Sequence, residues 1–363
     1  MIRWIAPPLA VLIAIAITGC GGEPERATAG APATFFGIAP QDATSDADRA
    51  RMAAGNVGSY HVLLSWAKVE ASPGVYSWST YDDLLAGLAV NGIDPIPYVF
   101  GTPSHFAGAP NIAPTTSVEA LKAWDDFLAA AAARYGPGGE FWDSFALSHP
   151  GVEPRPLTVW EIWNEVNSPT FWAPDPDPDQ YATLLKRSAR TIHKVDPSAQ
   201  IMVAGMFATP NSAKAIQSFE FLRELFKKPN VDEAVDLVAV HPYGPHIKDV
   251  KRQMARTYEQ MKEGGNGEDG VWVTEIGWGS NPNVKSELTK TAKKQAVLLR
   301  KAYELLIKKR DAWNVRGALW YTWRDPANPV GRCGWCPSAG LVDNDLDGKP
   351  AWREYTKLSG GTP

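Results

Sequence analysis

Two glutamates in similar surroundings are the residues of this chain best suited to acid–base or nucleophilic chemistry. Glu165 lies in the segment WEIWNEVN at residues 160–167, and Glu275 lies in TEIGW at residues 274–278. Each follows an apolar run with the pattern of a buried strand. A buried carboxylate without a partner is costly, so neither is easily explained as core. An ion pair or a helix cap would explain one such glutamate, but two at strand ends indicate a functional pair.

Further polar and aromatic side chains stand at the ends of neighbouring predicted strands. His241 and Tyr243, in the segment HPY, close one apolar run and offer hydrogen-bond donors that would keep Glu275 charged. A lone histidine is more often structural, but the place of His241 one strand before Glu275 favours the site. Trp320 and Trp323 close the last run. We expect one of them, preferably Trp323, to form a flat floor beneath a substrate ring.

A repeating fold would bring these strand ends together. From residue 34 onwards, short apolar runs alternate with amphipathic stretches, which is typical of β/α units. The predicted strands are 35–38, 61–66, 94–100, 157–163, 200–204, 235–240, 270–274 and 316–321, and the predicted helices are 46–54, 81–91, 118–135, 180–195, 216–226, 250–262, 288–308 and 350–358. Eight units predict one α/β domain, a (β/α)8 TIM barrel over residues 34–358, with its site at the C-terminal strand ends. The alternative is an open doubly wound sheet, but no Gly-rich phosphate turn follows the first strand.

The paired glutamate motifs resemble those of the retaining glycoside hydrolases of clan A, in particular families 39 and 5. The resemblance covers roughly residues 35–355, and the two glutamates are 110 positions apart (275 minus 165). It implies that Glu165 is the general acid/base, that Glu275 is the nucleophile and that Asn164 binds the sugar 2-hydroxyl. Retention requires two carboxylates about 5 Å apart, one forming a glycosyl ester while the other donates and then accepts a proton. The expected substrate is a β-linked oligo- or polysaccharide, and no cofactor or metal is expected.

One position departs from the pattern of those families. They usually carry an Arg five residues before the tryptophan equivalent to Trp66, and this chain has His61 there. An Arg supplies a fixed charge and a rigid fork, whereas a His supplies neither at neutral pH. We still expect His61 and Trp66 to line the substrate site. The alternative functions are a surface carbohydrate-binding lipoprotein with weakened catalysis, for which His61 is the support, and a transglycosidase.

The amino terminus predicts export. A positive residue precedes an uncharged apolar run at residues 5–17, which is too short to span a bilayer and is typical of a signal peptide. The run leads into ITGC at residues 17–20, which resembles the lipobox of bacterial lipoproteins. We therefore predict a lipoprotein signal peptide at residues 1–19, a lipid on Cys20 and a flexible linker at residues 20–33. The expected location is the cell surface, anchored in the membrane by that lipid alone, with secretion as the alternative.

Composition narrows the classes of partner. The net charge of -4 gives no reason to expect a nucleic acid, and we expect a monomer. The 15 tryptophans favour a carbohydrate site only modestly, because most tryptophans fill cores. Trp163, Trp172 and Trp278 are further stacking candidates for which packing is an equal alternative.

Two motifs near the carboxyl end have structural interpretations. Cys333 and Cys336 enclose a Gly-Trp pair, and in an exported protein they predict a disulfide that clamps a loop, because further zinc ligands are lacking. The acidic spacing over residues 343–354 fits an EF-hand calcium loop. No entering helix is predicted before it, so an acidic turn is the preferred interpretation.

Overall fold

The structure is a computed structural model that describes residues 31–208, 212–327 and 333–363. The predicted signal peptide at residues 1–19, the lipid attachment at Cys20 and most of the linker at residues 20–33 lie outside the described residues. None of the helices within the described ranges combines the length and the apolar character needed to cross a bilayer.

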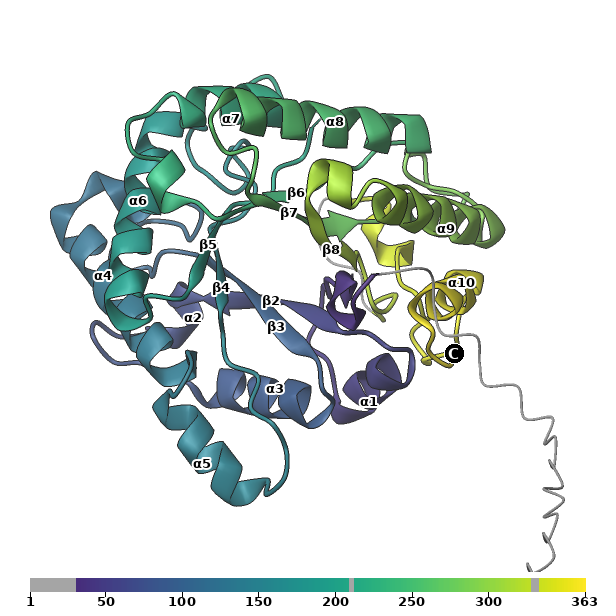
Figure 1. Ribbon diagram of the computed structural model, residues 1–363, viewed down its shortest axis with the longest axis horizontal. Coiled ribbons are helices and arrows are strands. Elements are labelled where there is room, and N and C mark those ends of the chain that lie inside the picture. The colour runs from purple at the N-terminus through teal and green to yellow at the C-terminus, as the bar shows by residue number, and fades with distance from the viewer. Residues whose placement is uncertain (1–30, 209–211, 328–332) are drawn as a thin grey trace, which may run out of the picture.

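Eight parallel strands close into a barrel, with each strand paired to the next and β8 paired back to β1, so the predicted (β/α)8 fold is confirmed (Figure 1). The strands are β1 Phe36–Ile38, β2 Ser59–Ser65, β3 Asp94–Phe100, β4 Val159–Ile162, β5 Gln200–Val203, β6 Leu237–Val240, β7 Gly270–Ile276 and β8 Val315–Trp320. The helices surround the strands as an outer layer, and they are α1 Asp46–Ala54, α2 Trp66–Val69, α3 Ser79–Val90, α4 Val118–Tyr135, α5 Glu140–Ser148, α6 Pro178–Val195, α7 Ser218–Phe226, α8 Ile247–Glu263, α9 Ala292–Lys308 and α10 Pro350–Ser359.

The predicted bounds differ from the observed ones mainly at element ends. Strand β3 and helices α1 and α4 have the predicted bounds, whereas α2 and α5 were not predicted. The predicted start of α9 at residue 288 is wrong. Thr291 caps this helix by accepting a hydrogen bond from the backbone N–H of Lys294 at 3.3 Å, and Leu288 instead accepts a bond from Gly279 in the preceding loop.

Strand side chains alternate between the barrel interior and the layer beneath the helices. The interior holds a small apolar cluster made of Ala39, Ile96, Val159, Met202, Leu237, Ala239, Trp272 and Leu319. A much larger cluster joins the outer faces of the strands to the helices. The parallel strands are therefore buried on both sides, which explains why they read as apolar runs.

Trp272 and Gly317 form a large–small pair inside the barrel. The two residues face each other in the β7–β8 register. A Cβ placed on Gly317 would lie 2.2 Å from the Trp272 ring. The ring thus occupies the space that a side chain at position 317 of β8 would need.

Replacing Gly317 with alanine should therefore overpack the interior. We expect Gly317→Ala to lower the free energy of unfolding by about 1–3 kcal/mol, measured by urea denaturation. Gly108→Ala is the matched control, because a Cβ there has no atom within 4 Å. Equal stability of the two variants would contradict this packing.

Candidate active site

On four strands, a polar side chain follows the apolar interior cluster towards the C-terminal end of the strand. Each of these polar residues lies two positions after a cluster residue: Glu161 after Val159, His241 after Ala239, Thr274 after Trp272 and Tyr321 after Leu319. Each step is two residues, which keeps the side chain on the interior face. The apolar floor of the barrel is therefore covered by a polar layer.

Glu275 reaches this layer through an irregularity in β7. Regular alternation would place Thr274 inside and Glu275 under the helices. The β7–β8 register shifts between Val273 and Ile276, as at a β-bulge. Ile276 is buried in the outer cluster, while the side chain of Glu275 keeps 17% of its surface exposed. The bulge therefore allows both Thr274 and Glu275 to serve the site.

The backbone around Glu165 adopts an unusual conformation. Glu165 has φ +40° and Trp163 has φ +74°, in the left-handed region that costs most residues about 1–3 kcal/mol. The backbone N–H of Glu165 donates to the carbonyl of Gly205 at 2.9 Å. Gly205 in turn donates its N–H to Glu161 at 2.7 Å. These two hydrogen bonds connect the strained turn, through Gly205, to the buried carboxylate of Glu161.

His241 lies between the two glutamates. Its Nδ1 is 3.0 Å from Oε1 of Glu165 and 3.8 Å from Oε2 of Glu275. Its Nε2 is 3.1 Å from the hydroxyl of Thr274. Tyr243 donates its hydroxyl to Oε2 of Glu275 at 2.6 Å. One oxygen of each glutamate and a nitrogen of His241 all lie within 4.8 Å of one another, so the structure brings together the two predicted catalytic residues and the two predicted donors.

The charges of this cluster depend on one another. Burial alone would lower the pKa of His241, but the carboxylates of Glu275 and Glu165 outweigh it and raise that pKa to about 9. Burial and the charge of Glu275 raise the pKa of Glu165, against the opposing effect of His241. At neutral pH the imidazole is therefore positively charged, and Glu165 holds a proton more readily than an ordinary glutamate.

The same three side chains, Glu165, His241 and Glu275, are the only such group in the described parts of the chain that lies close enough to hold a metal ion. A histidine ligand must offer a neutral nitrogen. The pKa of about 9 places a proton on His241 near neutrality, between its carboxylate neighbours. Hydrogen bonds from His241 to Glu165 at 3.0 Å and from Tyr243 to Glu275 at 2.6 Å join these groups in one cluster.

The acidic segment at residues 343–354 begins with a closed turn at residues 343–347 and ends in α10. The carboxylate of Asp343 accepts the backbone N–H groups of Asp345 and Asp347 at 3.0 and 2.8 Å, and its own N–H donates to the carbonyl of Asp347. These bonds use one of the two carboxylate oxygens of Asp343 to close the turn, and Glu354 at the far end pairs with Lys357 at 2.9 Å. The geometry agrees with the preferred interpretation of an acidic turn.

His61 is buried below the site, not at the substrate surface. Its side chain is 2% exposed, and its Nε2 donates to the carboxylate of Glu161 at 2.9 Å. Glu161 is fully buried and also binds Gly205. The predicted substrate contact of His61 is therefore corrected to a supporting contact beneath Glu165.

Trp66 and Trp320 are also not at the substrate surface. Both are fully buried. The indole of Trp66 donates to Glu70 at 2.6 Å, and that of Trp320 donates to the carbonyl of Ala339 at 2.9 Å. The other three stacking candidates, Trp163, Trp172 and Trp278, are buried as well. These rings fill the layer under the helices and fasten loops.

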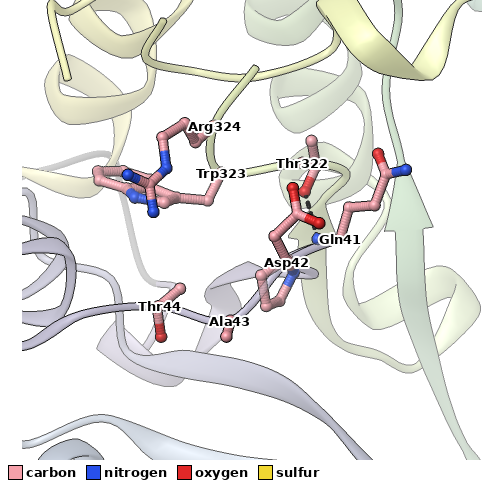
Figure 2. Close-up of a pocket in the computed structure, with 8 residues that line it drawn as sticks. Gln41, Asp42, Ala43, Thr44, Thr322, Trp323 and Arg324 are labelled. Atoms are coloured by element: carbon pink, nitrogen blue, oxygen red, sulfur yellow. Dashed lines mark hydrogen bonds between the residues drawn. The ribbon is translucent and has the colours of Figure 1, made fainter. Parts of the chain in front are cut away.

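Trp323, the preferred floor residue, is likewise corrected. Its side chain is 1% exposed, and its indole donates to Asp48 at 2.7 Å. Figure 2 shows it beside a small pocket at the rim of the barrel, where the segment after β1 faces the segment after β8. Gln41 and Thr322 join these segments by a 2.8 Å hydrogen bond. The ring supports this rim from below.

Aromatic residues that were not predicted from the sequence lie near Glu275. Tyr321 and Tyr98 are partly exposed on the interior face. Burial raises the pKa of both hydroxyls, and the nearby charge of Glu275 raises it further. Trp335 packs on Tyr243 and Tyr321 with ring centroids 5.2 and 5.8 Å away. Tyr321 could have been found by stepping two residues from the apolar Leu319, whereas nothing in the sequence places Trp335.

The predicted Cys333–Cys336 disulfide is present in the structure. It closes the loop that carries Trp335.

Comparison with known proteins agrees with this site. Residues 153–325 match the family model described as a glycosyl hydrolase catalytic core. The match confirms the resemblance to glycoside hydrolases, and the matched segment contains both Glu165 and Glu275. No protein with a curated description matches the chain.

Solved structures of glycoside hydrolases share the fold. A family 39 glycoside hydrolase from Bacteroides cellulosilyticus WH2 superposes with a TM-score of 0.64 at 20% identity, over 90% of this chain and 63% of that one. A monomeric β-xylosidase from Caulobacter crescentus CB15 gives 0.62 at 21% identity, over 91% and 69%. A glucosidase from Croceicoccus marinus gives 0.64 at 12% identity, over 93% and 69%. This chain therefore spans less than two thirds of the Bacteroides enzyme and shares its barrel.

The charge assigned to His241 can be measured directly. Imidazole resonances followed by NMR should titrate with a pKa of about 9. Glu275→Gln and Glu165→Gln should each lower that value, because each removes a negative charge that stabilises the imidazolium. A His241 that titrates at or below 6.5 in the unsubstituted protein would contradict the proposed electrostatics.

Proposed function

We propose that this protein is a retaining glycosidase that hydrolyses β-linked oligo- or polysaccharides. The observation that carries the proposal is the placement of Glu165 and Glu275 with carboxylate oxygens within 4.8 Å across His241. Retaining enzymes hold their carboxyl groups about 5–5.5 Å apart, whereas inverting enzymes leave about 6.5–9.5 Å for a water molecule. The short spacing favours direct attack by one carboxylate on the sugar.

The environment of each glutamate suits one of the two roles. Glu165, whose pKa is raised, donates its proton to the glycosidic oxygen as that bond breaks. Glu275 faces the positive His241 and accepts a bond from Tyr243 on Oε2, which leaves Oε1 to attack the anomeric carbon. In the second step Glu165 takes a proton from water, the resulting hydroxide adds to the anomeric carbon, and the ester bond to Glu275 breaks.

Asn164 supports a sugar in this position. Its side chain is 5% exposed, and its Oδ1 is buried with no hydrogen-bond partner among the described residues. An unpaired buried acceptor costs about 1–3 kcal/mol. The 2-hydroxyl of a bound sugar would supply the missing donor, which is the role implied by the resemblance to clan A.

The structural neighbours guide the choice of substrates. They include proteins named as β-xylosidase, exo-β-1,4-mannosidase and glucosidase. We therefore propose that xylosides, mannosides and glucosides in β linkage are the classes to test. His61 was the support for the alternative of a carbohydrate-binding lipoprotein with weakened catalysis. That support is weakened, because His61 binds Glu161 and does not displace Glu165 or Glu275.

Catalysis should depend on both glutamates in different ways. On aryl β-glycosides, Glu275→Ala should reduce kcat at least about 10⁴-fold, because no ester can form. Glu165→Ala should reduce turnover strongly for alkyl aglycones but much less for dinitrophenyl aglycones, which leave without protonation. Added azide should accelerate Glu165→Ala by replacing water in the second step.

The exposed Glu119, on α4, gives the matched control, and Glu119→Ala should keep full activity. If the unsubstituted protein hydrolyses none of the β-glycosides, or if Glu275→Ala remains active, the proposal is wrong.

We also propose that the protein is exported and anchored by a lipid on Cys20. The support is the lipobox-like segment at residues 17–20. Cells supplied with labelled palmitate should label the protein, and Cys20→Ser should remove the label and leave an unprocessed precursor. Labelling that persists in Cys20→Ser would contradict the anchor.

A further inference from the structure

The loop after β8 brings an aromatic ring to the nucleophile side of the catalytic pair. Trp335 is partly exposed and meets Tyr243 edge to face at 5.2 Å and Tyr321 at 5.8 Å. Tyr243 is the residue that donates to Glu275. Trp335 is therefore separated from the proposed nucleophile by a single ring.

Trp335 differs from the three buried tryptophans that were expected to line the site. The indole N–H groups of Trp66, Trp320 and Trp323 each donate to a partner within the protein. Within the described residues, the indole of Trp335 has no such partner, and part of its surface stays open. Of these four rings it alone can offer a surface to a ligand.

Two sets of contacts hold the backbone of Trp335. The disulfide between Cys333 and Cys336 closes a four-residue loop around it. On the other side, the carbonyl of Trp335 accepts two bonds from Ser338, and Ser338 is tied to the N–H of Ser280 beyond β7.

Gly279 lets this loop approach closely. A Cβ on Gly279 would lie 2.7 Å from the carbonyl oxygen of Trp335. The loop that carries the ring is thus closed by the disulfide and packs on the segment that follows β7.

We propose that Trp335 contacts the substrate by packing its indole face on a sugar ring on the Glu275 side, and that the disulfide is the positioning element that keeps it there. This inference rests on the proposed glycosidase function and adds a specificity-determining residue to it. An aromatic face suits the C–H face of a pyranose. Without the disulfide, the loop would have more backbone conformations, and it would lose them when Trp335 packs on a bound sugar. The disulfide reduces this entropic cost and so favours binding.

The first test measures binding without turnover. Calorimetry on the Glu275→Gln protein would use xylotriose, cellotriose and mannotriose as probes. Trp335→Ala in that background should weaken the Kd of the best probe about tenfold, while Trp335→Phe should restore most of the affinity because it keeps an aromatic face.

The second test separates KM from kcat in the active enzyme. Trp335→Ala should raise KM for the best glycoside about tenfold and change kcat less than threefold. Dithiothreitol reduces the disulfide to two thiols and is itself oxidised to its cyclic disulfide. That reduction, or the Cys333→Ser/Cys336→Ser variant, should raise KM in the same direction. Dithiothreitol should not change the KM of the double-serine variant, which has no disulfide to reduce. It should also not raise the KM of Trp335→Ala further, because the ring that the disulfide positions is already absent.

The outcomes distinguish this inference from the proposed function. Active enzyme with unchanged KM and Kd in Trp335→Ala would overturn the role of Trp335 and leave the glycosidase intact. Sugar binding that Trp335→Ala weakens, in a protein that hydrolyses nothing, would support the contact and overturn the glycosidase. If Trp335→Ala loses kcat while KM and Kd stay unchanged, the binding role is overturned, and Trp335 instead supports Tyr243. Neither binding nor hydrolysis of any probe would overturn both.

Discussion

The positive charge on His241 is the interaction on which this site depends. Two carboxylates with oxygens within 4.8 Å repel each other, and burial adds to the cost of ionising both. The imidazolium between Glu165 and Glu275 offsets that repulsion, and the carboxylates in return raise its pKa to about 9. Space for this ring is kept open by Gly205, where a Cβ would lie 2.2 Å from Nε2 of His241.

The barrel delivers these groups by two departures from regular geometry. The bulge in β7 turns Glu275 into the mouth although its neighbour Thr274 already faces inward. At the left-handed turn the side chain of Glu165 stays 15% exposed, whereas Glu161 is fully buried. Strain of this kind persists only where surrounding bonds enforce it, and the bonds through Gly205 do so here. The two glutamates are therefore brought together by two local irregularities in an otherwise regular barrel.

The sequence predicted the barrel and placed the two glutamates at strand ends because apolar periodicity and strand-end motifs are local signals. It failed for the tryptophans, because ring exposure depends on tertiary packing: Trp323 is held by Asp48 and Trp320 by the loop after β8. The interior position of Tyr321 could have been predicted from strand alternation, because Tyr321 lies two residues after Leu319. The position of Trp335 could not, since it follows from a disulfide loop folding back over the site.

The central claim is that Glu275 bonds to the sugar while Glu165 manages the proton. It is tested most directly by treating the active enzyme with a dinitrophenyl 2-deoxy-2-fluoro-β-glycoside of the preferred sugar, which slows ester hydrolysis, and sequencing the labelled peptide by mass spectrometry. The account predicts one fluorosugar attached to Glu275. A label on another residue, or continued turnover with inverted product and no adduct, would contradict it.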